Sequence, residues 1–400
     1  MHTLILHILI ILIAARVMGE IATLLGAPGV IGELIAGILI GPSLFGWVQP
    51  SDAILILAEI GVILLLFEVG LETDISKLLN TGGKAVTVAL GGFIAPLVMG
   101  FAAAHYLFDQ SILISLFIGG TLTATSIGIT ARTLMDVHQQ NSAEGQITLG
   151  AAVLDDVLGV ILLALLYEFS VSGEVNWINA SKVFAFVAFF FLMAPIMAKL
   201  LSHLISHLDQ RIDNPGLIPV TIVSLVLFFA WLAHWFGAPE LLGGFAAGLA
   251  LSRRFFLPFG LSIKTNADFS QKIESQMKPI IQLFTPIFFV AIGLSLDLRQ
   301  VDWSSPMFWA FSLSLLVIAI VGKFTGALLI KEPFPRKIVI GMAMVPRGEV
   351  GLIFAGLGSA AGVFTDNIYT SMIMVVLYTS LLSPYWIKLY YRKFTAPQTD

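Results

Sequence analysis

The sequence predicts an all-α polytopic membrane protein with about thirteen transmembrane helices. Hydrophobic residues make up 58% of the 400 residues and charged residues only 12%, whereas about 25% of a soluble domain is charged. The mean hydropathy is +0.95, and apolar runs long enough to cross a bilayer recur along the whole chain. Most of the chain is therefore expected to lie in a lipid bilayer.

The apolar runs set the order of the predicted helices. The first run lacks the basic region of a signal peptide, so it is expected to remain as a helix. The ninth run is short, and the longest polar connection, residues 252–278, separates it from the tenth. The predicted spans lie at residues 3–25, 28–47, 53–72, 84–107, 111–135, 143–168, 180–205, 216–236, 239–253, 279–297, 306–330, 337–362 and 366–390.

Basic residues fall almost entirely in one set of alternate loops, and cytoplasmic loops are the ones that carry an excess of lysine and arginine. The other set holds little beyond Arg299 and Lys182. We therefore expect the N-terminus outside and the C-terminus in the cytoplasm. The basic set contains Lys77, Lys84, Arg132, Lys199, Arg211, Arg253, Arg254, Lys264, Lys272, Lys278, Lys331, Arg336, Lys337, Arg392 and Lys393.

Two pairs of similar segments predict an internal repeat. Gly32–Gly41 resembles Gly243–Ser252, and Phe67–Asp74 resembles Val290–Asp297. The matching segments fall in the second and ninth runs and in the third and tenth, so the copies enter the membrane in opposite directions. An inverted-topology repeat of this kind is a known plan of secondary transporters.

Two runs contain residues that interrupt a helix. Glycine and small hydroxylated residues crowd Ile118–Arg132, and a Pro-Arg-Gly sequence interrupts Val345–Gly351. A kink with hydroxyl groups bonded to the previous turn is the plain structural alternative. Matching breaks in two halves indicate a binding site instead, so we predict two discontinuous helices that meet at that site. Arg347 and Glu349 flank the second break, where they would compensate the half-helix dipoles or pair with each other.

Two adjacent aspartates, Asp155 and Asp156, lie in the otherwise almost wholly apolar segment Ile147–Leu166. Carboxylates near the middle of a membrane helix are costly, and they usually mark an ion or proton pathway. A partly desolvated carboxylate also binds a proton more readily, so a proton and a cation would compete for it. The pair is therefore the candidate site for ions.

Lys323 lies near the middle of another predicted span and needs a carboxylate partner. Neighbouring residues on a helix diverge by about 100°, so one aspartate can pair with Lys323 while the other faces a water-filled cavity. The ion would then bind at the aspartate that does not pair with Lys323. Thr125 and Ser126, at the first break, could supply further oxygen ligands to Na⁺. A purely structural ion pair is the alternative.

Several motifs together resemble the bacterial cation:proton antiporters of the monovalent cation:proton antiporter-2 family, and most closely its sodium/proton exchangers with an aspartate pair. The motifs extend from residue 30 past residue 350, over nearly the whole membrane region. They are Val30–Gly37, Leu66–Glu72, Ala124–Arg132, Gly150–Gly159, Pro286–Gly293, Gly322-Lys323 and Pro346–Leu352.

The resemblance implies a division into moving and fixed parts. Residues 1–80 and 216–300 would form the dimerisation domain of a homodimer. Residues 81–175 and 301–395 would form a transport core in which the two discontinuous helices cross. Residues 176–215 would form a linking helix. The core would move against the fixed homodimer as an elevator within the lipid bilayer.

The same resemblance implies roles for the charged residues. Asp156 would be the main ligand of cation and proton, and Asp155 would pair with Lys323. The chain would be a secondary transporter rather than an enzyme, placed in a bacterial inner membrane. Its ligands would be transported Na⁺ or Li⁺ and H⁺, with no resident cofactor and no nucleic-acid partner.

Sodium is the expected cation, with about two protons exchanged for each cation by resemblance to antiporters of this kind. Potassium-selective relatives often carry Gln-Asp and a large C-terminal domain, whereas this chain has Asp-Asp and ends soon after its last apolar run. K⁺/H⁺ exchange remains the nearest alternative. An intramembrane aspartyl protease fits poorly, because adjacent aspartates diverge and Lys323 would hold one ionised. An ion channel also remains open.

Overall fold

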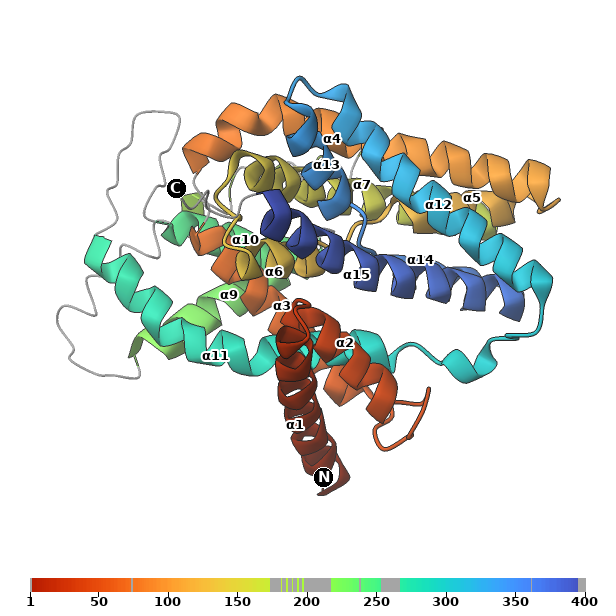
Figure 1. Ribbon diagram of the computed structural model, residues 1–400. Helices are drawn as coiled ribbons and strands as arrows, with labels where there is room; N and C mark the ends of the chain where they lie inside the picture. The colour runs from red at the N-terminus through yellow and green to blue at the C-terminus, as the bar shows by residue number, and fades with distance from the viewer. Residues whose placement is uncertain are drawn as a thin grey trace. The chain divides into compact units, whose positions relative to one another are not determined.

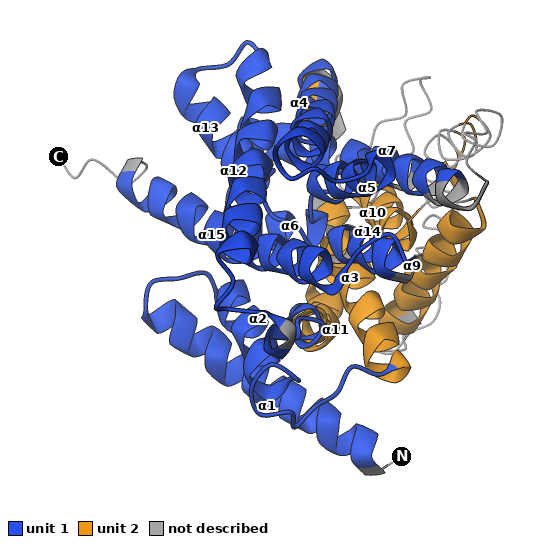
Figure 2. Cartoon of the chain, turned by 90° about the vertical axis from the view of Figure 1, so that its right-hand side faces the viewer, with its two compact units in different colours: residues 1–51, 82–176, 289–400 blue, residues 52–81, 177–288 orange. Residues whose placement is uncertain are grey.

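The computed structural model describes residues 2–72, 75–172, 217–236, 239–252, 267–360 and 362–394, with scattered positions between 181 and 197. The described part is helical and contains no strand, which confirms the predicted all-α class (Figure 1). By contacts between Cα atoms the chain divides into two compact units (Figure 2). Residues 1–51, 82–176 and 289–400 form unit 1, and residues 52–81 and 177–288 form unit 2.

Each predicted apolar run within the described residues contains helix, whereas the run at 180–205 lies outside them apart from the scattered positions. Among the described residues, nine candidate spans are long and apolar enough to cross a membrane. The helices are α1 His2–Leu24, α2 Gly29–Ile40, α3 Asp52–Glu72, α4 Ile75–Ala102, α5 Ile112–Thr123, α6 Ile127–Asp136, α7 Ala143–Ser172, α9 Leu217–Trp235, α10 Glu240–Leu251, α11 Ala267–Leu294, α12 Pro306–Leu329, α13 Phe334–Ala343, α14 Glu349–Ala360 and α15 Asp366–Phe394, with a π-helical turn η1 Ala103–Leu107 and a 3-10 turn η2 Leu298–Gln300.

Two boundaries differ clearly from their predictions, and the first is that of α4, which begins at Ile75 although its run was expected to begin at residue 84. The tenth run was expected to begin at residue 279, but α11 begins at Ala267, inside the polar connection. The added segment is rich in Gln, Lys, Glu and Met, which all favour helix, so helical propensity extends the element beyond its apolar part. Hydropathy alone marks only the apolar part of such a helix. The total of thirteen spans and the inverted repeat stay predictions.

In unit 2, α3 packs against α10 through glycines that let the two backbones approach. A Cβ added at Gly248 would lie 2.1 Å from the Phe67 carbonyl oxygen, and one added at Gly70 would lie 2.3 Å from the Phe245 carbonyl oxygen. Both separations are far below a van der Waals contact. Small residues at such crossings are what helix association in a membrane requires, because lipid gives no hydrophobic drive between helices.

In unit 1, a similar contact between α4 and α12 positions Lys323. A Cβ added at Gly326 would lie 2.4 Å from the Val88 carbonyl oxygen, and one added at Gly322 would lie 2.8 Å from Pro96. These glycines stand one residue before and three residues after Lys323 on α12. The close approach therefore fixes the depth and rotation at which α12 presents Lys323.

Replacing Gly326 by alanine is expected to destabilise the protein by about 1–3 kcal/mol, because the new methyl group would overlap α4. Gly356, inside α14, has no atom within 4 Å of an added Cβ, so Gly356→Ala should be neutral or stabilising by up to about 1 kcal/mol. Thermal unfolding of the purified variants in detergent measures both. Equal unfolding midpoints for the two variants would contradict the close α4–α12 packing.

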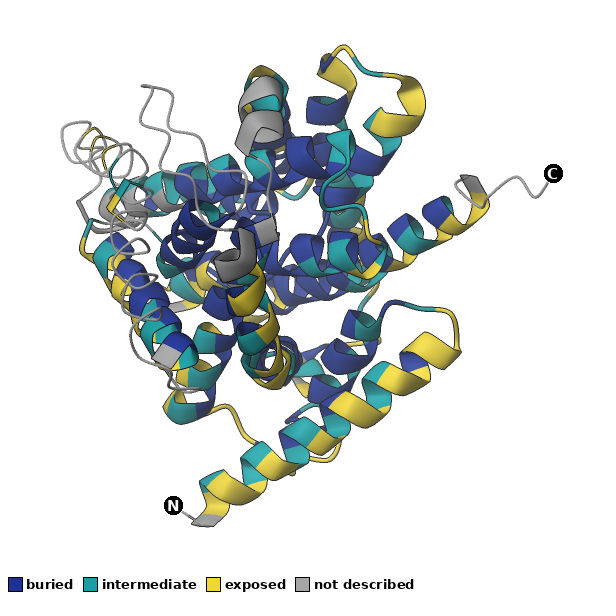
Figure 3. Cartoon of the chain, turned by 90° about the vertical axis from the view of Figure 1, so that its left-hand side faces the viewer, coloured by how far each residue is buried: buried dark blue, intermediate teal, exposed yellow. Residues whose placement is uncertain are grey.

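The apolar surface of α1 remains largely uncovered, as the yellow residues along the N-terminal helix show (Figure 3). Ile5, Leu9 and Ile13 are each more than half exposed. Exposed apolar surface of this extent faces lipid or another protein surface. The predicted dimerisation domain and the predicted transport core are defined by how residues would move, whereas the two compact units are defined by how residues pack. The division into these two domains therefore stays a prediction.

Candidate functional site

The aspartate pair lies within α7, which is helical without interruption from Ala143 to Ser172. Asp155 is fully buried and Asp156 is 1% exposed. Because a helix turns by about 100° at each residue, the two carboxyl groups leave α7 in different directions. The structure thus gives the two adjacent aspartates separate surroundings within unit 1.

Lys323 forms a buried ion pair with Asp155. The distance from Lys323 Nζ to Asp155 Oδ2 is 2.8 Å, and both side chains are wholly inaccessible to solvent. This is the pairing that the sequence suggests. A charge of either sign buried alone would be very costly, so the pair lets α7 and α12 carry opposite charges inside the protein.

The first break separates α5 from α6 at residues 124–126, as its glycines and hydroxylated residues predict. The Ser126 hydroxyl group accepts a hydrogen bond from the Ile129 amide at 3.4 Å, which caps the start of α6. The Ser126 amide donates across the site to the Pro346 carbonyl oxygen at 2.8 Å. Backbone groups that a continuous helix would satisfy internally are therefore bonded to the other break.

The second break separates α13 from α14 at residues 344–348 and contacts the first one directly. Thr125 Oγ1 donates to the Met344 carbonyl oxygen at 3.0 Å, and Thr130 Oγ1 donates to the Ala343 carbonyl oxygen at 2.7 Å. A Cβ at Gly348 would lie 2.5 Å from the Ser126 hydroxyl oxygen, so only glycine fits there without a shift. Two discontinuous helices meeting at their breaks are what the sequence predicts.

Arg347 is fully buried between the two breaks. Its guanidinium group donates to the Val345 carbonyl oxygen, to the Leu122 carbonyl oxygen at 2.5 Å and to the Ala319 carbonyl oxygen at 3.2 Å. Leu122 is in the last turn of α5, where carbonyl groups lack helical partners and the helix dipole is negative. The positive charge therefore lies where it compensates the end of a half-helix.

Glu349 is the first residue of α14, and an acidic residue at this position suits the positive end of a helix dipole. Its side chain lies outside the described part of the structure, so its predicted pairing stays a prediction. Thr125 and Ser126 lie at the break, and their hydroxyl groups serve the backbone there. Their predicted part in cation binding also stays a prediction.

Two serines of α15 hold the second break and are absent from the sequence-based site. The Ser380 hydroxyl group donates to the Arg347 carbonyl oxygen, and the Ser383 hydroxyl group donates to the Met342 carbonyl oxygen at 2.6 Å. Their spacing of three residues puts them on one helix face. That spacing was a usable signal in the sequence, but it does not reveal which carbonyl groups the hydroxyl groups meet.

A series of ion pairs and hydrogen bonds connects four helices of unit 1 at a place away from the aspartates. Lys84 Nζ lies 2.5 Å from Glu332 Oε1, and Arg336 NH1 lies 3.1 Å from Glu332 Oε2. Arg336 Nε lies 3.6 Å from Glu144 Oε2, and the Tyr391 hydroxyl group donates to Glu144 Oε1 at 3.0 Å. The series links α4, α13, α15 and the first turn of α7, the helix that carries the aspartates.

The stability of the folded protein should fall in acid, when protonation of Glu332 removes the central negative charge of these ion pairs. The hydrogen bond from Lys84, and next that from Arg336, lowers the pKa of Glu332 below its ordinary value of 4.5. A lowered pKa stabilises the folded state above the ordinary value, and that contribution is lost as the pH falls through the folded-state pKa. Glu332→Gln should therefore unfold at a lower temperature at neutral pH, with a smaller further loss in acid.

Lys84→Gln is the matched second variant, because it removes the main cause of the pKa shift and leaves Arg336 in place. Thermal unfolding midpoints measured from neutral pH to below pH 4.5 compare the variants with the parent. Parallel curves for parent and Lys84→Gln would show that the Lys84 hydrogen bond contributes nothing to this dependence.

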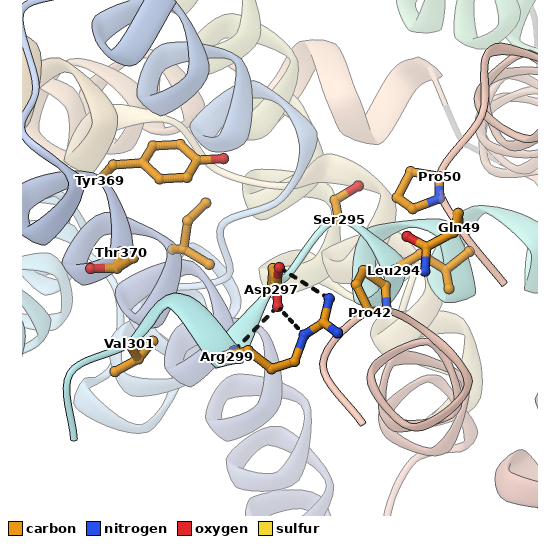
Figure 4. Close-up of a pocket in the computed structure, with 11 residues that line it drawn as sticks. Pro42, Gln49, Pro50, Leu294, Ser295, Asp297, Arg299, Val301, Tyr369 and Thr370 are labelled. Atoms are coloured by element: carbon orange, nitrogen blue, oxygen red, sulfur yellow. Dashed lines mark hydrogen bonds and ion pairs between the residues drawn. The ribbon is translucent and has the colours of Figure 1, made fainter. Parts of the chain in front are cut away.

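A pocket of ≈280 Å³ in unit 1 is separate from the aspartate site (Figure 4). Asp297 and Arg299 form an ion pair at its wall, with Arg299 Nε 3.1 Å from Asp297 Oδ1. Asp155, Asp156 and Lys323 are not among the residues that line it. The pocket therefore carries no part of the ion-site assignment.

Carboxylate oxygens are the donors that the aspartate pair offers to a cation. Among the residues that the structure describes, no three His, Cys, Asp or Glu side chains gather where they could hold a metal ion. A cation at Asp155 and Asp156 would draw its other ligands from hydroxyl groups, carbonyl groups or water. Oxygen ligands of this kind suit hard cations.

Known proteins resemble the chain over nearly its whole length. A family model described as "Sodium/hydrogen exchanger, transmembrane" matches residues 8–393. The chain is 31% identical to the high-affinity Na⁺/H⁺ antiporter NhaS3 of Synechocystis sp., covering 96% of this chain and 88% of that one. It is 33% identical to the Na⁺/H⁺-K⁺ antiporter GerN of Bacillus cereus, covering 96% of this chain and 95% of that one.

A solved structure shares the fold. The sodium proton antiporter MjNhaP1 from Methanocaldococcus jannaschii at pH 8 superposes with a TM-score of 0.68 and 18% identity, covering 97% of this chain and 96% of that one. The resemblance that the motifs indicate is confirmed by the family model and by the curated relatives. The protein is a multi-pass membrane protein and belongs to the transmembrane sodium/hydrogen exchanger family.

Proposed function

We propose that this chain is a secondary active antiporter that exchanges Na⁺ or Li⁺ for H⁺ across the membrane, with Asp156 as the ligand that cation and proton share. The observation that carries the proposal is the buried aspartate pair on α7. Lys323 engages Asp155 at 2.8 Å, so the second carboxyl group of the pair is the one assigned to the ion. No catalytic step is involved, because the family consists of transporters and not enzymes.

Exchange follows from competition at one carboxyl group. Burial disfavours the ionised form of a carboxyl group such as that of Asp156, so binding of a proton or of a cation stabilises it. Because either one neutralises it, binding of the cation displaces the proton. If the site can open to the other side of the membrane only when its carboxyl group is neutralised, transport of the cation in one direction requires transport of the proton in the other.

Alternating access is proposed to be an elevator movement of residues 81–175 and 301–395 against residues 1–80 and 216–300 of a homodimer. The direct hydrogen bonds between the two breaks support it, since they join both discontinuous helices into one body around the site. The positive-inside pattern supports an N-terminus outside and a C-terminus in the cytoplasm. The bacterial sources of the relatives support a place in a bacterial inner membrane.

Exchange of K⁺ for H⁺ is the second candidate. The name of the Bacillus cereus relative includes K⁺ beside Na⁺ and H⁺, and it matches 96% of this chain. The Asp-Asp pair favours Na⁺ over K⁺ in the resemblance, with electrogenic exchange of about two protons for each cation. Selectivity among monovalent cations depends on the ligands around Asp156 and on the size of the site.

Exchange by the purified protein in proteoliposomes tests the proposal. An internal pH dye would report proton movement after addition of Na⁺, Li⁺ or K⁺ at several pH values. We expect Na⁺ and Li⁺ to collapse a preset pH gradient, and an imposed membrane potential to alter the rate. A response to K⁺ alone would establish the second candidate, and single-channel currents without coupled proton movement would reject antiport.

A further inference from the structure

Glu33 is a buried carboxyl group that the proposed exchange does not use. It lies on α2 and is 6% exposed. Its Oε2 atom has no hydrogen-bond partner within the described part of the chain. Its Oε1 atom lies 3.8 Å from where a Gly19 Cβ would be, against α1. Most buried polar groups are satisfied, so a carboxyl group with an unsatisfied oxygen requires an explanation.

The packing of α1 on α2 keeps Glu33 in place. A Cβ added at Gly32 would lie 2.0 Å from the Met18 carbonyl oxygen, so the two backbones are in direct contact beside the carboxyl group. This contact places Glu33 beside α1, where this residue is only 6% exposed. The charge of Glu33 is therefore decided by the groups around it.

Charged groups of α1 and α6 act on Glu33. Arg132 attracts its negative charge most strongly, Asp136 repels it, and Arg16 attracts it. Each arginine already has a carboxylate of its own helix, since Arg132 Nε lies 3.1 Å from Asp136 Oδ1, and Arg16 NH2 lies 2.7 Å from Glu20 Oε1. An ionised Glu33 would compete with Asp136 for Arg132.

No other charged group in the described part of the chain acts on Glu33 as strongly as these three. Lys388 of α15 donates to the Ala27 carbonyl oxygen at 2.8 Å, just before α2, and acts on Asp136. The end of α11 that meets Gly37 consists of residues 289–294, which include no titratable group. Arg132 is thus the cation most strongly coupled to Glu33.

We propose that Glu33 is a second proton-binding site of this chain, whose ionised form attracts Arg132 away from Asp136 and so shifts the half-helix α6 against α2. The arrangement seen here favours the protonated form, because Oε2 has no hydrogen-bond partner among the described residues and a negative charge would be costly at this depth. When the proton leaves to water, the attraction between Glu33 and Arg132 replaces part of the pairing within α6.

Movement of α6 reaches the ion site through the first break. α6 begins at Ile127, and the preceding Ser126 is bonded to Pro346 of the second break. Any displacement of α6 therefore strains the contact between the two breaks. The inference rests on the proposed antiport and adds to it a proton that must leave before the site changes sides.

The test compares how steeply exchange rises with pH. If both Asp156 and Glu33 must lose protons, the logarithm of the Na⁺-driven exchange rate should rise with pH at a limiting slope of about two on the acidic side. In Glu33→Gln the slope should fall to about one, because the variant lacks one of the two titrations. Glu33→Asp keeps a carboxyl group and should keep the slope of about two.

Glu240→Gln is the matched control, since it removes a helix carboxylate outside the α1–α2–α6 cluster and should leave the slope unchanged. Infrared difference spectra recorded on acidification give a second readout that needs no transport. We expect the parent to show a protonated-carboxyl band that is missing in Glu33→Gln. A slope equal to that of the parent in a folded Glu33→Gln variant would overturn the proposal, as would an unchanged infrared band.

The two proposals can fail separately. If the parent exchanged no cation for protons, the proposed function would fail, while the infrared titration would still report whether Glu33 binds a proton. If the parent exchanged normally and Glu33→Gln matched it at every pH, the antiport would stand and the role of Glu33 would be rejected.

Discussion

Asp156→Asn is expected to abolish coupled exchange of Na⁺ for H⁺, with at least a hundredfold loss of rate, of the order caused by removing a group essential to a reaction. The amide has nearly the same size as the carboxyl group, so the buried site keeps its shape. It cannot take up or release a proton, and it offers the cation no negative charge. Cation and proton would therefore lose their shared ligand together.

The control is Asp302→Asn, the same substitution in the exposed loop before α12, where Asp302 accepts hydrogen bonds from Ser304. That variant should exchange at the parental rate. Both proteins would be reconstituted at equal density and assayed with the same pH dye. Substantial Na⁺-coupled proton movement by Asp156→Asn would remove Asp156 from the centre of the mechanism.

Lys323→Gln has the second largest expected effect, because it leaves Asp155 buried without its counter-charge. Breaking a buried ion pair from one side costs about 3–5 kcal/mol if the remaining group stays charged. The substitution also removes one positive charge from the buried core. We therefore expect a lower unfolding temperature, together with altered charge movement on solid-supported membranes.

The double variant Asp155→Asn/Lys323→Gln measures the interaction energy between the two residues apart from the effect of each single substitution. It removes both charges and keeps similar volumes, so it should recover much of the stability that Lys323→Gln loses. Additive losses from the two substitutions would show that the 2.8 Å contact does not couple the residues energetically. An unchanged transport current in Lys323→Gln would count against a role for Lys323 in coupling.

The centre of the site could be predicted from sequence because charges inside a membrane have few possible partners. Lys323 needs a carboxylate at its own depth, and the pair on α7 offers the deepest acids. The breaks were equally visible, since glycine, proline and hydroxylated residues weaken helices wherever they gather. Both features follow from the cost of burying polar groups rather than from details of packing.

The partners of the freed backbone groups could not be predicted in this way. Ser380 and Ser383 look like ordinary polar residues of an apolar helix until α15 lies beside the second break. Arg347 was expected to compensate a half-helix, but its bond to the Ala319 carbonyl oxygen depends on how α12 passes the site. Such contacts are set by the tertiary fold, which periodicity and hydropathy do not encode.

The burial of Glu33 is another feature that the sequence does not predict. Its neighbour Gly32 indicates a close helix contact, and nothing in the sequence around it distinguishes an interfacial acid from a buried one. Its burial depends on the close approach of α1 at Gly19, and its charged neighbours come from α6. Both are features of the tertiary fold. The ion pairs around Glu332 likewise cannot be predicted from sequence, because they form only when the tertiary fold brings four helices together.

The most direct test of the shared carboxyl group is the number of protons released when Na⁺ binds. Calorimetric titration of the detergent-solubilised protein with Na⁺, in two buffers of different ionisation enthalpy, gives that number without any transport. Competition at Asp156 predicts release of about one proton for each Na⁺ bound near the pH at which the group is half protonated, and none from Asp156→Asn. Tight Na⁺ binding that released no proton at any pH would contradict the account.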